Sequence, residues 1–417
     1  MKRVFPAISA TLLALLLVGP RATAQVAAPP PGTNLQIFVM TMGPGAEVWE
    51  RFGHNAIWVR DTVQKVDLIY NYGMFDFRDP DLVPHFAMGR PVYWLGVDDD
   101  LENTLRTYRS RERSLDVQEL NLPPIQRAEI ALRLAENARP EQKNYIYDYY
   151  RDNCSTRVRD LLDGVLGGAL GLATKGKSGE GTLRWHTHRS LTNDKLMYVG
   201  ILAALGPMVD RPLDQWGEMF LPQKLQERLR ELRITDAEGR SVPLVKSESR
   251  LIDVNRYSVE PEPPQWGMMF SVVALTLMLA ILSGLFAGGL GAPGRVIGAL
   301  WLLLVGIGGV VLLLLWLVTN HMAAAGNRNL LLLSPAALLV IPGALSARRR
   351  GPGAWAPRAA WFVLGSVIVG SILAAFPSIS GQWNLQIAQL IVLPTVAAAW
   401  LAIRLSPRPA STLPPLP

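Results

Sequence analysis

YIYDYYRDNCSTRVRD, Tyr145–Asp160, is the stretch around which the fold and function of this chain are predicted. It contains Cys154, the only cysteine in the 417 residues. Apolar residues follow it at helical spacing, at Val158, Leu161, Leu162 and Val165. Asn153 or Ser155 is suited to cap such a helix. The sequence therefore places a lone thiol at the start of a helix, where backbone N–H groups and the helix dipole stabilise a thiolate.

Two interpretations of Cys154 are open. A buried cysteine often acts as a small hydrophobe, but this one has polar neighbours, among them Arg151, Asp152 and Arg157. A single cysteine excludes an intramolecular disulfide and a cysteine-rich metal site. Catalysis by the thiol is the favoured interpretation.

A second stretch, FGHNAIWVRD at Phe52–Asp61, supplies a candidate base. His54 stands just before an apolar, strand-like run, which would hold the imidazole on a rigid element. A catalytic thiol needs a base within hydrogen-bond reach, although a lone histidine is often only a core or capping residue. The group that orients the imidazole stays open, with Asn71, Asp61 and Asn55 as the nearby polar choices.

An oxyanion hole requires hydrogen-bond donors beside the thiol. The backbone N–H of Cys154 and the side chain of Asn153 are the expected donors. His186 and His188 form an H-x-H pair that would suit a metal, but they lack carboxylate or thiol partners at ligand spacing. We expect no metal and no cofactor.

The N-terminus has the pattern of a secretory signal peptide. Residues 1–24 combine Lys2 and Arg3 with a short apolar run and an Ala22-Thr23-Ala24 cleavage pattern. Residues 25–34 then form a Pro- and Ala-containing linker. The mature chain is therefore expected in an oxidising compartment, where an unpaired thiol is a liability unless it is used.

Charge divides the rest of the chain into two domains. All 34 acidic residues lie between Glu47 and Glu262, which indicates a periplasmic domain over residues 35–262. Residues 263–405 are predicted to form a transmembrane domain, and residues 406–417 a cytoplasmic tail. The five helices expected in the transmembrane domain cover residues 268–290, 296–318, 330–345, 359–376 and 387–403.

The arginines support this topology. With five crossings, most arginines of the membrane part lie on the cytoplasmic side, as the positive-inside rule requires. Of the loop arginines, only Arg328 is left outside. The cytoplasmic group is Arg295, Arg348, Arg349, Arg350, Arg358, Arg404 and Arg408. The sequence pI of about 9.6 reflects these membrane-flanking charges, so no nucleic-acid partner is expected.

Residues 35–262 read as an α+β domain with a small antiparallel sheet. The strands are predicted at Leu35–Met42, Ala56–Val59, Val66–Tyr70 and Pro91–Val97. The helices are predicted at Leu101–Arg113, Pro124–Asn137 and Trp185–Leu205.

The loop TNHMAAAGNRN, Thr319–Asn329, falls on the same side of the membrane as Cys154. It is either a polar interfacial loop or a substrate-positioning loop. In the second case His321, Asn327 and Asn329 would contact a lipid head group or an acyl carbonyl.

Four motifs carry a resemblance to a known family. They are MGPG at Met42–Gly45, FGHNAIWV at Phe52–Val59, YNYGMFDF at Tyr70–Phe77 and YDYYRDNCSTRVRD at Tyr147–Asp160. Together they resemble the bacterial envelope family DUF4105, named for the N-terminal periplasmic domain of Lnb, a lipoprotein N-acyltransferase. NHMAAAGNRNLLLLSP at Asn320–Pro335 resembles the membrane part of that family.

The order of a GH motif before an NC motif is also similar to circularly permuted NlpC/P60 (papain-like) enzymes of the lecithin–retinol acyltransferase type. The resemblance implies Cys154 as nucleophile and His54 as base, with Tyr72 and Arg157 as further substrate-positioning candidates. It implies a multi-pass protein of the bacterial inner membrane, with a phospholipid as acyl donor and a lipoprotein as acceptor. The alternatives are a cysteine peptidase or amidase acting on peptidoglycan, a hydrolase of a lipid amide or ester, and a non-catalytic envelope scaffold.

Overall fold

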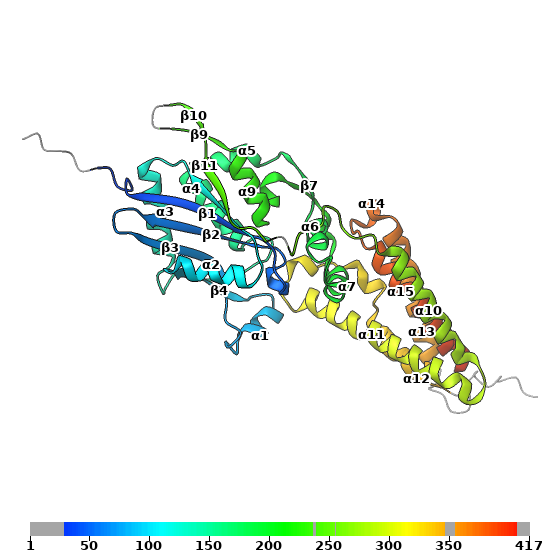
Figure 1. Cartoon of the computed structure of the whole chain (residues 1–417). Helices are drawn as coiled ribbons and strands as arrows, with labels where there is room; N and C mark the ends of the chain where they lie inside the picture. The colour runs from blue at the N-terminus through cyan, green and yellow to red at the C-terminus, as the bar shows by residue number, and fades with distance from the viewer. Residues whose placement is uncertain (1–28, 237–238, 255, 347–354, 407–417) are drawn as a thin grey trace, which may run out of the picture.

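The computed structural model describes residues 29–236, 239–254, 256–346 and 355–406. It has two parts in chain order, a sheet covered by helices and then a bundle of long helices (Figure 1). The expected α+β domain followed by a helical membrane domain is confirmed. The predicted signal peptide, residues 25–28 of the linker, Arg348–Arg350 and residues 407–417 of the tail lie outside the described residues.

The main sheet has seven antiparallel strands in the order β11-β5-β1-β2-β3-β4-β6. The strands are β1 (Leu35–Met42), β2 (His54–Asp61), β3 (Val66–Met74), β4 (Val92–Asp98), β5 (Leu115–Leu120), β6 (Asn144–Ile146) and β11 (Val245–Ile252). Two small ribbons add β7 (Ser178–Thr182) with β8 (Pro212–Asp214), and β9 (Arg233–Thr235) with β10 (Ser241–Pro243).

Helices cover both faces of the sheet, which explains why β1 carries apolar residues on both of its faces. Ile37 and Val39 pack on one side beneath α3, α4 and α9, and Phe38 and Met40 pack on the other side against α2. The helices of this domain are α1 (Leu82–Ala87), α2 (Leu101–Ser110), α3 (Pro124–Asn137), α4 (Cys154–Val165), α5 (Ala169–Thr174), α6 (Leu183–Ser190), α7 (Lys195–Ala204), α8 (Gln215–Glu218) and α9 (Pro222–Glu231), with 3-10 turns at Val48–Glu50 and Pro207–Asp210.

The bundle contains four helical segments in the described residues that are long and apolar enough to cross a membrane. They are Gly267–Leu285, Gly288–Leu317, Trp355–Ala375 and Leu385–Leu405. These segments contain α10 (Gly267–Leu282), α11 (Ala292–Leu317), α13 (Trp355–Ala375) and α15 (Leu385–Leu405), with 3-10 turns at Ser283–Leu285 and Gly288–Gly291.

The third apolar segment, predicted as a helix over residues 330–345, is not continuous. It consists of 3-10 turns at Arg328–Leu331 and Pro335–Val340, followed by α12 (Ile341–Ala344). Pro335 and Pro342 explain the breaks, because proline lacks the N–H that an α-helix needs. The segment packs against the glycine-bearing faces of α11 and α13, at Gly306 and Gly370.

The two domains share one interface. Tyr198 of α7 belongs to the same apolar core as the bundle, lies 4.8 Å from the Trp266 ring and donates to Gln386 Oε1. The loop after α11, with a 3-10 turn at Met322–Ala324, and the loop around α14 (Pro377–Ser380) pack against the chain after α7. The sheet domain and the helical bundle therefore form one structure.

Two predicted elements differ in extent. Trp185–Leu205 is two helices, because Asp194 accepts from Met197 N and caps a new start at α7. The helix predicted to reach Arg113 ends at Ser110, and the next strand is β5. Neither β5 nor the edge strand β11 is expected from the sequence.

Candidate active site

Cys154 is the first residue of α4, as predicted. Asn153 caps the helix: its Oδ1 accepts from Ser155 N and Thr156 N, both at 2.9 Å, and Thr156 Oγ1 accepts from Asn153 N at 2.8 Å. Asn153 Nδ2 donates to Tyr149 O and Phe220 O. Both ends of this amide are used, so Asn153 positions the cysteine and is not a free oxyanion donor.

Burial decides the protonation of the thiol. Cys154 is 8% exposed, and burial raises the pKa of its thiol. The backbone N–H groups of Asn55, Ser155 and Cys154 itself bond to the sulfur and lower the pKa, as does the charge of Arg113, but burial prevails. The resting group is therefore a thiol. The Asn55 contact also brings the start of β2 to the sulfur.

His54 is the first residue of β2, and Asn71 of the neighbouring strand β3 orients its ring. His54 Nε2 lies 3.1 Å from Asn71 Oδ1, while Asn71 Nδ2 donates to Ile69 O at 3.4 Å. This pairing makes the Asn71 oxygen the acceptor, so Nε2 carries the proton and Nδ1 carries the lone pair. Of the three polar residues left open by the sequence, Asn71 is the one that contacts the imidazole.

The environment keeps His54 neutral. Burial and the nearby charge of Arg113 lower the pKa of His54 to about 4, against the hydrogen bond to Asn71, which raises it. His54 and the thiol are therefore both neutral at rest, the starting state that general-base catalysis requires, and the residue after His54, Asn55, contacts the sulfur through its backbone N–H.

Strand β3 contains a bulge next to Cys154. Asn71 pairs with Gly96 and Met74 with Trp94, so one extra residue is inserted in β3. Gly73 lies in this bulge with φ +88°, and a Cβ there would lie 3.7 Å from Cys154 Cβ and 3.8 Å from Tyr145 Oη. The bulge thus brings Tyr145 close to Cys154.

Tyr145 is a site residue that the sequence did not identify. Its Oη is buried and has no hydrogen-bond partner in the described part of the chain. Burial and the adjacent Cys154 raise the pKa of Tyr145, so the phenol stays protonated and can donate. The only signal was its place at the start of the aromatic run before Cys154.

Arg113 is a second residue that the sequence did not identify. Its guanidinium is buried, pairs with Glu50 Oε1 at 3.1 Å and donates to Gly43 O at 2.8 Å. It therefore holds the MGPG motif in place at Gly43 and supplies the positive charge that acts on both His54 and Cys154.

Comparison with known protein families gives matches to both parts of the chain. Residues 24–194 match the family model described as the Lnb N-terminal periplasmic domain, and residues 264–406 match the Lnb transmembrane domain. The chain belongs to the Lnb family. With its four apolar helices it is a membrane protein carrying a periplasmic domain. No curated protein and no solved structure matches it.

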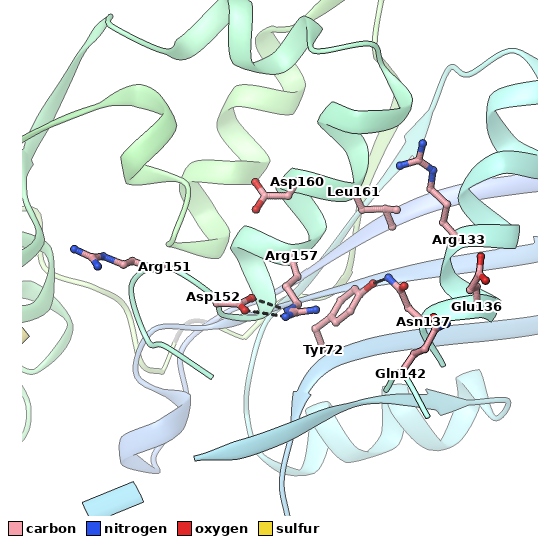
Figure 2. Close-up of a pocket in the computed structure, with 10 residues that line it drawn as sticks. All are labelled: Tyr72, Arg133, Glu136, Asn137, Gln142, Arg151, Asp152, Arg157, Asp160 and Leu161. Atoms are coloured by element: carbon pink, nitrogen blue, oxygen red, sulfur yellow. Dashed lines mark hydrogen bonds and ion pairs between the residues drawn. The ribbon is translucent and has the colours of Figure 1, made fainter. Parts of the chain in front are cut away.

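Tyr72 and Arg157, the two further substrate-positioning candidates in this Lnb-family chain, both lie against the Tyr145 ring. Arg157 lies 3.6 Å from the centroid of the Tyr145 ring and forms a two-point pair with Asp152, and the Tyr72 hydroxyl accepts from Asn137. They line an open polar pocket of about 750 Å³ (Figure 2). Cys154 and His54 are not among its lining residues. Tyr72 and Arg157 therefore pack against Tyr145 and face this pocket, which Cys154 and His54 do not line.

Asn55 and the loop asparagines are occupied elsewhere. The Asn55 amide donates to Met40 O and Thr41 Oγ1 inside the core. Asn327 and Asn329 are buried at the domain interface, where their amides donate to backbone carbonyls of α7. These three side-chain amides are therefore engaged away from the thiol, and only the backbone N–H of Asn55 contacts the sulfur.

His321 lies closer to the active-site stretch. Its ring stacks 6.4 Å from Tyr149 and lies 6.0 Å from Phe86 of α1. The Lnb membrane domain thus reaches the chain that leads into Cys154.

Proposed function

We propose that this protein is a thiol acyltransferase of the bacterial inner membrane. It would transfer an acyl chain from a phospholipid to the N-terminal amine of a diacylglyceryl-cysteine lipoprotein through a thioester on Cys154. The observation that best supports this proposal is the hydrogen bond from His54 Nε2–H to Asn71 Oδ1. It leaves Nδ1 as a base on the strand that meets the thiol.

In the first half-reaction His54 Nδ1 takes the proton from the Cys154 thiol as the sulfur attacks the ester carbonyl. A C–S bond forms, and the ester C–O bond then breaks. His54 returns its proton to the departing alkoxide. The products are a lysophospholipid and an acyl thioester on Cys154.

In the second half-reaction the lipoprotein amine attacks the thioester. A C–N bond forms and the C–S bond breaks, while His54 moves the amine proton to the sulfur. The thiol is regenerated and the product is an amide. A thioester suits this exchange because it is reactive toward amines, and burial of Cys154 limits competing hydrolysis.

Each tetrahedral intermediate places negative charge on the former carbonyl oxygen. The backbone N–H of Cys154 and the unpartnered Tyr145 Oη are the donors proposed to receive it. The spanning helices support the reaction in a different way, since they hold the site where both lipid-anchored substrates are confined.

The test is lipoprotein N-acylation in a bacterial host that lacks its own N-acyltransferase. Mass spectrometry of N-terminal lipopeptides should show N-acylated product with the wild-type chain and none with Cys154→Ala. Cys154→Ser is the matched control. It keeps the size of the side chain and the Asn153 cap of α4 but supplies a poor nucleophile, so it should also give no N-acylated product. Unchanged N-acylation in both variants would refute the proposal.

The same strains separate the alternatives. Muropeptides altered by the wild-type chain but not by Cys154→Ala, without any N-acylation, would indicate a peptidoglycan amidase. Lysolipid and free fatty acid without N-acylated lipopeptide would indicate a lipid hydrolase.

A further inference from the structure

Helix α1 exposes apolar side chains that no described residue covers. Val83 is 69% exposed, Phe86 51% and Met88 42%, while Leu82 is buried beneath them. We call Val83, Phe86 and Met88 the α1 patch. Three large apolar groups exposed side by side on one short segment indicate a surface with a partner.

The α1 patch is fixed to the end of a spanning helix. Asn320, three residues after α11, donates its backbone N–H to Met88 O at 2.9 Å, and Arg90 donates to Asn320 Oδ1 at 3.3 Å. Gly89, with φ +70°, allows this approach, because a Cβ there would lie 2.7 Å from His321 N. In Figure 1, α1 lies below the sheet, near the end of α11.

The exposed apolar surface of α11 continues to the end of the helix near Asn320. Its 26 residues extend about 39 Å at 1.5 Å per residue, more than the ~30 Å of hydrocarbon in a bilayer. Its last residues remain exposed and apolar, at Leu317 and Val318. The hydrogen bonds of Asn320 therefore hold Met88 near the plane where α11 leaves the membrane.

Charged residues flank the α1 patch in the sequence. Asp79 and Asp81 precede the apolar run and Arg90 follows it, so the charged groups flank the α1 patch and do not interrupt it. Met322, which follows His321 in the loop after α11, is a further exposed apolar side chain at 52%.

We propose that the α1 patch inserts into the membrane leaflet that faces the periplasmic domain. The occupant is lipid, as opposed to a protein partner. The insertion orients the active-site stretch, since Phe86 contacts His321 and His321 stacks on Tyr149, five residues before Cys154. The proposal goes beyond acyl transfer and holds for any reaction at Cys154.

The single cysteine makes a direct measurement possible. Cys154→Ala gives a full-length chain without cysteine, into which Val83→Cys or Phe86→Cys is introduced singly and labelled with a nitroxide. Val63→Cys is the matched control, because Val63 is 75% exposed and lies in the β2–β3 turn, at the end of the sheet away from the spanning helices (Figure 1). Each protein is reconstituted in phosphatidylethanolamine–phosphatidylglycerol vesicles.

Power-saturation EPR compares collisions with oxygen, which concentrates in lipid, and with a water-soluble nickel chelate. Labels at 83 and 86 should show an oxygen-to-nickel accessibility ratio several-fold above that of the label at 63. Equal ratios at all three positions would place the α1 patch in water and overturn the proposal. Low accessibility to both reagents at 83 and 86 would place it against protein, which would overturn it equally.

Discussion

At the residue scale, the candidate catalytic pair follows from the sequence but the group that orients the imidazole does not. Cys154 is the only thiol, and His54 precedes an apolar strand, so both stand out. Asn71 lies 17 positions after His54 on the next strand. Choosing it over Asp61 or Asn55 needs the strand register and the bulge after Asn71, which no local pattern reveals.

The first residue-scale prediction concerns pH. Because the pKa of His54 is about 4, the base is neutral above that value, and acylation of Cys154 should hold to about pH 4–5 and fall below it. Asn71→Asp places a carboxylate on Nε2–H, favours imidazolium and raises the His54 pKa by about 1–3 units. The acid limb of the pH–rate profile should move to higher pH accordingly. An unmoved limb would mean that His54 is not the base.

A second residue-scale prediction concerns Tyr145. Tyr145→Phe removes a hydroxyl without a described partner, so thermal stability should stay the same or rise. Loss of an oxyanion donor should slow acyl transfer about 10²–10³-fold.

Tyr150→Phe is the matched control for that experiment. The Tyr150 hydroxyl pairs with Thr187 Oγ1 at 2.7 Å within the core. Its loss should lower stability by about 1 kcal/mol and leave the rate nearly unchanged. Equal rates for wild type and Tyr145→Phe would remove Tyr145 from the mechanism.

At the scale of elements, the apolar β1 and the capped α4 were predictable, and β5 was not. The sequence of β5, LDVQEL, is short and alternates only weakly, and it follows a helix whose pattern continued to Arg113. Its strand character comes from pairing with β1. Pairing partners distant in sequence decide such short strands more than local preference does.

The element-scale prediction tests the β3 bulge. Gly73→Ala forces a residue with a Cβ into positive φ, at a cost of about 1 kcal/mol, and also places a methyl group in van der Waals contact with Cys154 and Tyr147, in the space beside the thiol. Gly176→Ala carries the same strain at φ +73° but has nothing within 4 Å of the added Cβ. Chemical denaturation should show similar losses for both. Activity should fall only in Gly73→Ala, and a matching fall in both would mean that strain alone affects the site.

At the scale of the whole molecule, the sequence predicted five crossings, whereas four helical segments in the described residues are long and apolar enough to cross, and the third predicted segment is broken. Arg328–Ala344 has 17 residues, which extend about 26–34 Å as a mixture of α and 3-10 turns, close to the ~30 Å core. Its irregular backbone packs on α11 and α13, and Ser366 donates to Leu331 O. Broken backbone at membrane depth is tolerated where protein surrounds it.

The whole-molecule prediction concerns the domain interface. Asn329 Nδ2 donates to Ala203 O at 2.9 Å, and its Oδ1 accepts from Asn384 at 2.6 Å. Asn329→Ala should lower the free energy of unfolding by about 1–3 kcal/mol, because it leaves buried partners unpaired. Asn320→Ala, in the exposed part of the same loop, should cost less. If Asn329→Ala instead kept its Tm and raised only the KM for phospholipid, Asn329 would be a substrate contact.

The central claim is that Cys154 carries the acyl chain. Purified protein is incubated with a phospholipid bearing isotopically labelled acyl chains, without acceptor, and the peptide containing Cys154 is analysed by mass spectrometry. We predict a labelled acyl adduct on Cys154 that hydroxylamine removes, greatly reduced in His54→Ala and absent in Cys154→Ala. A wild-type protein that N-acylates lipoproteins while Cys154 never carries label would contradict the account.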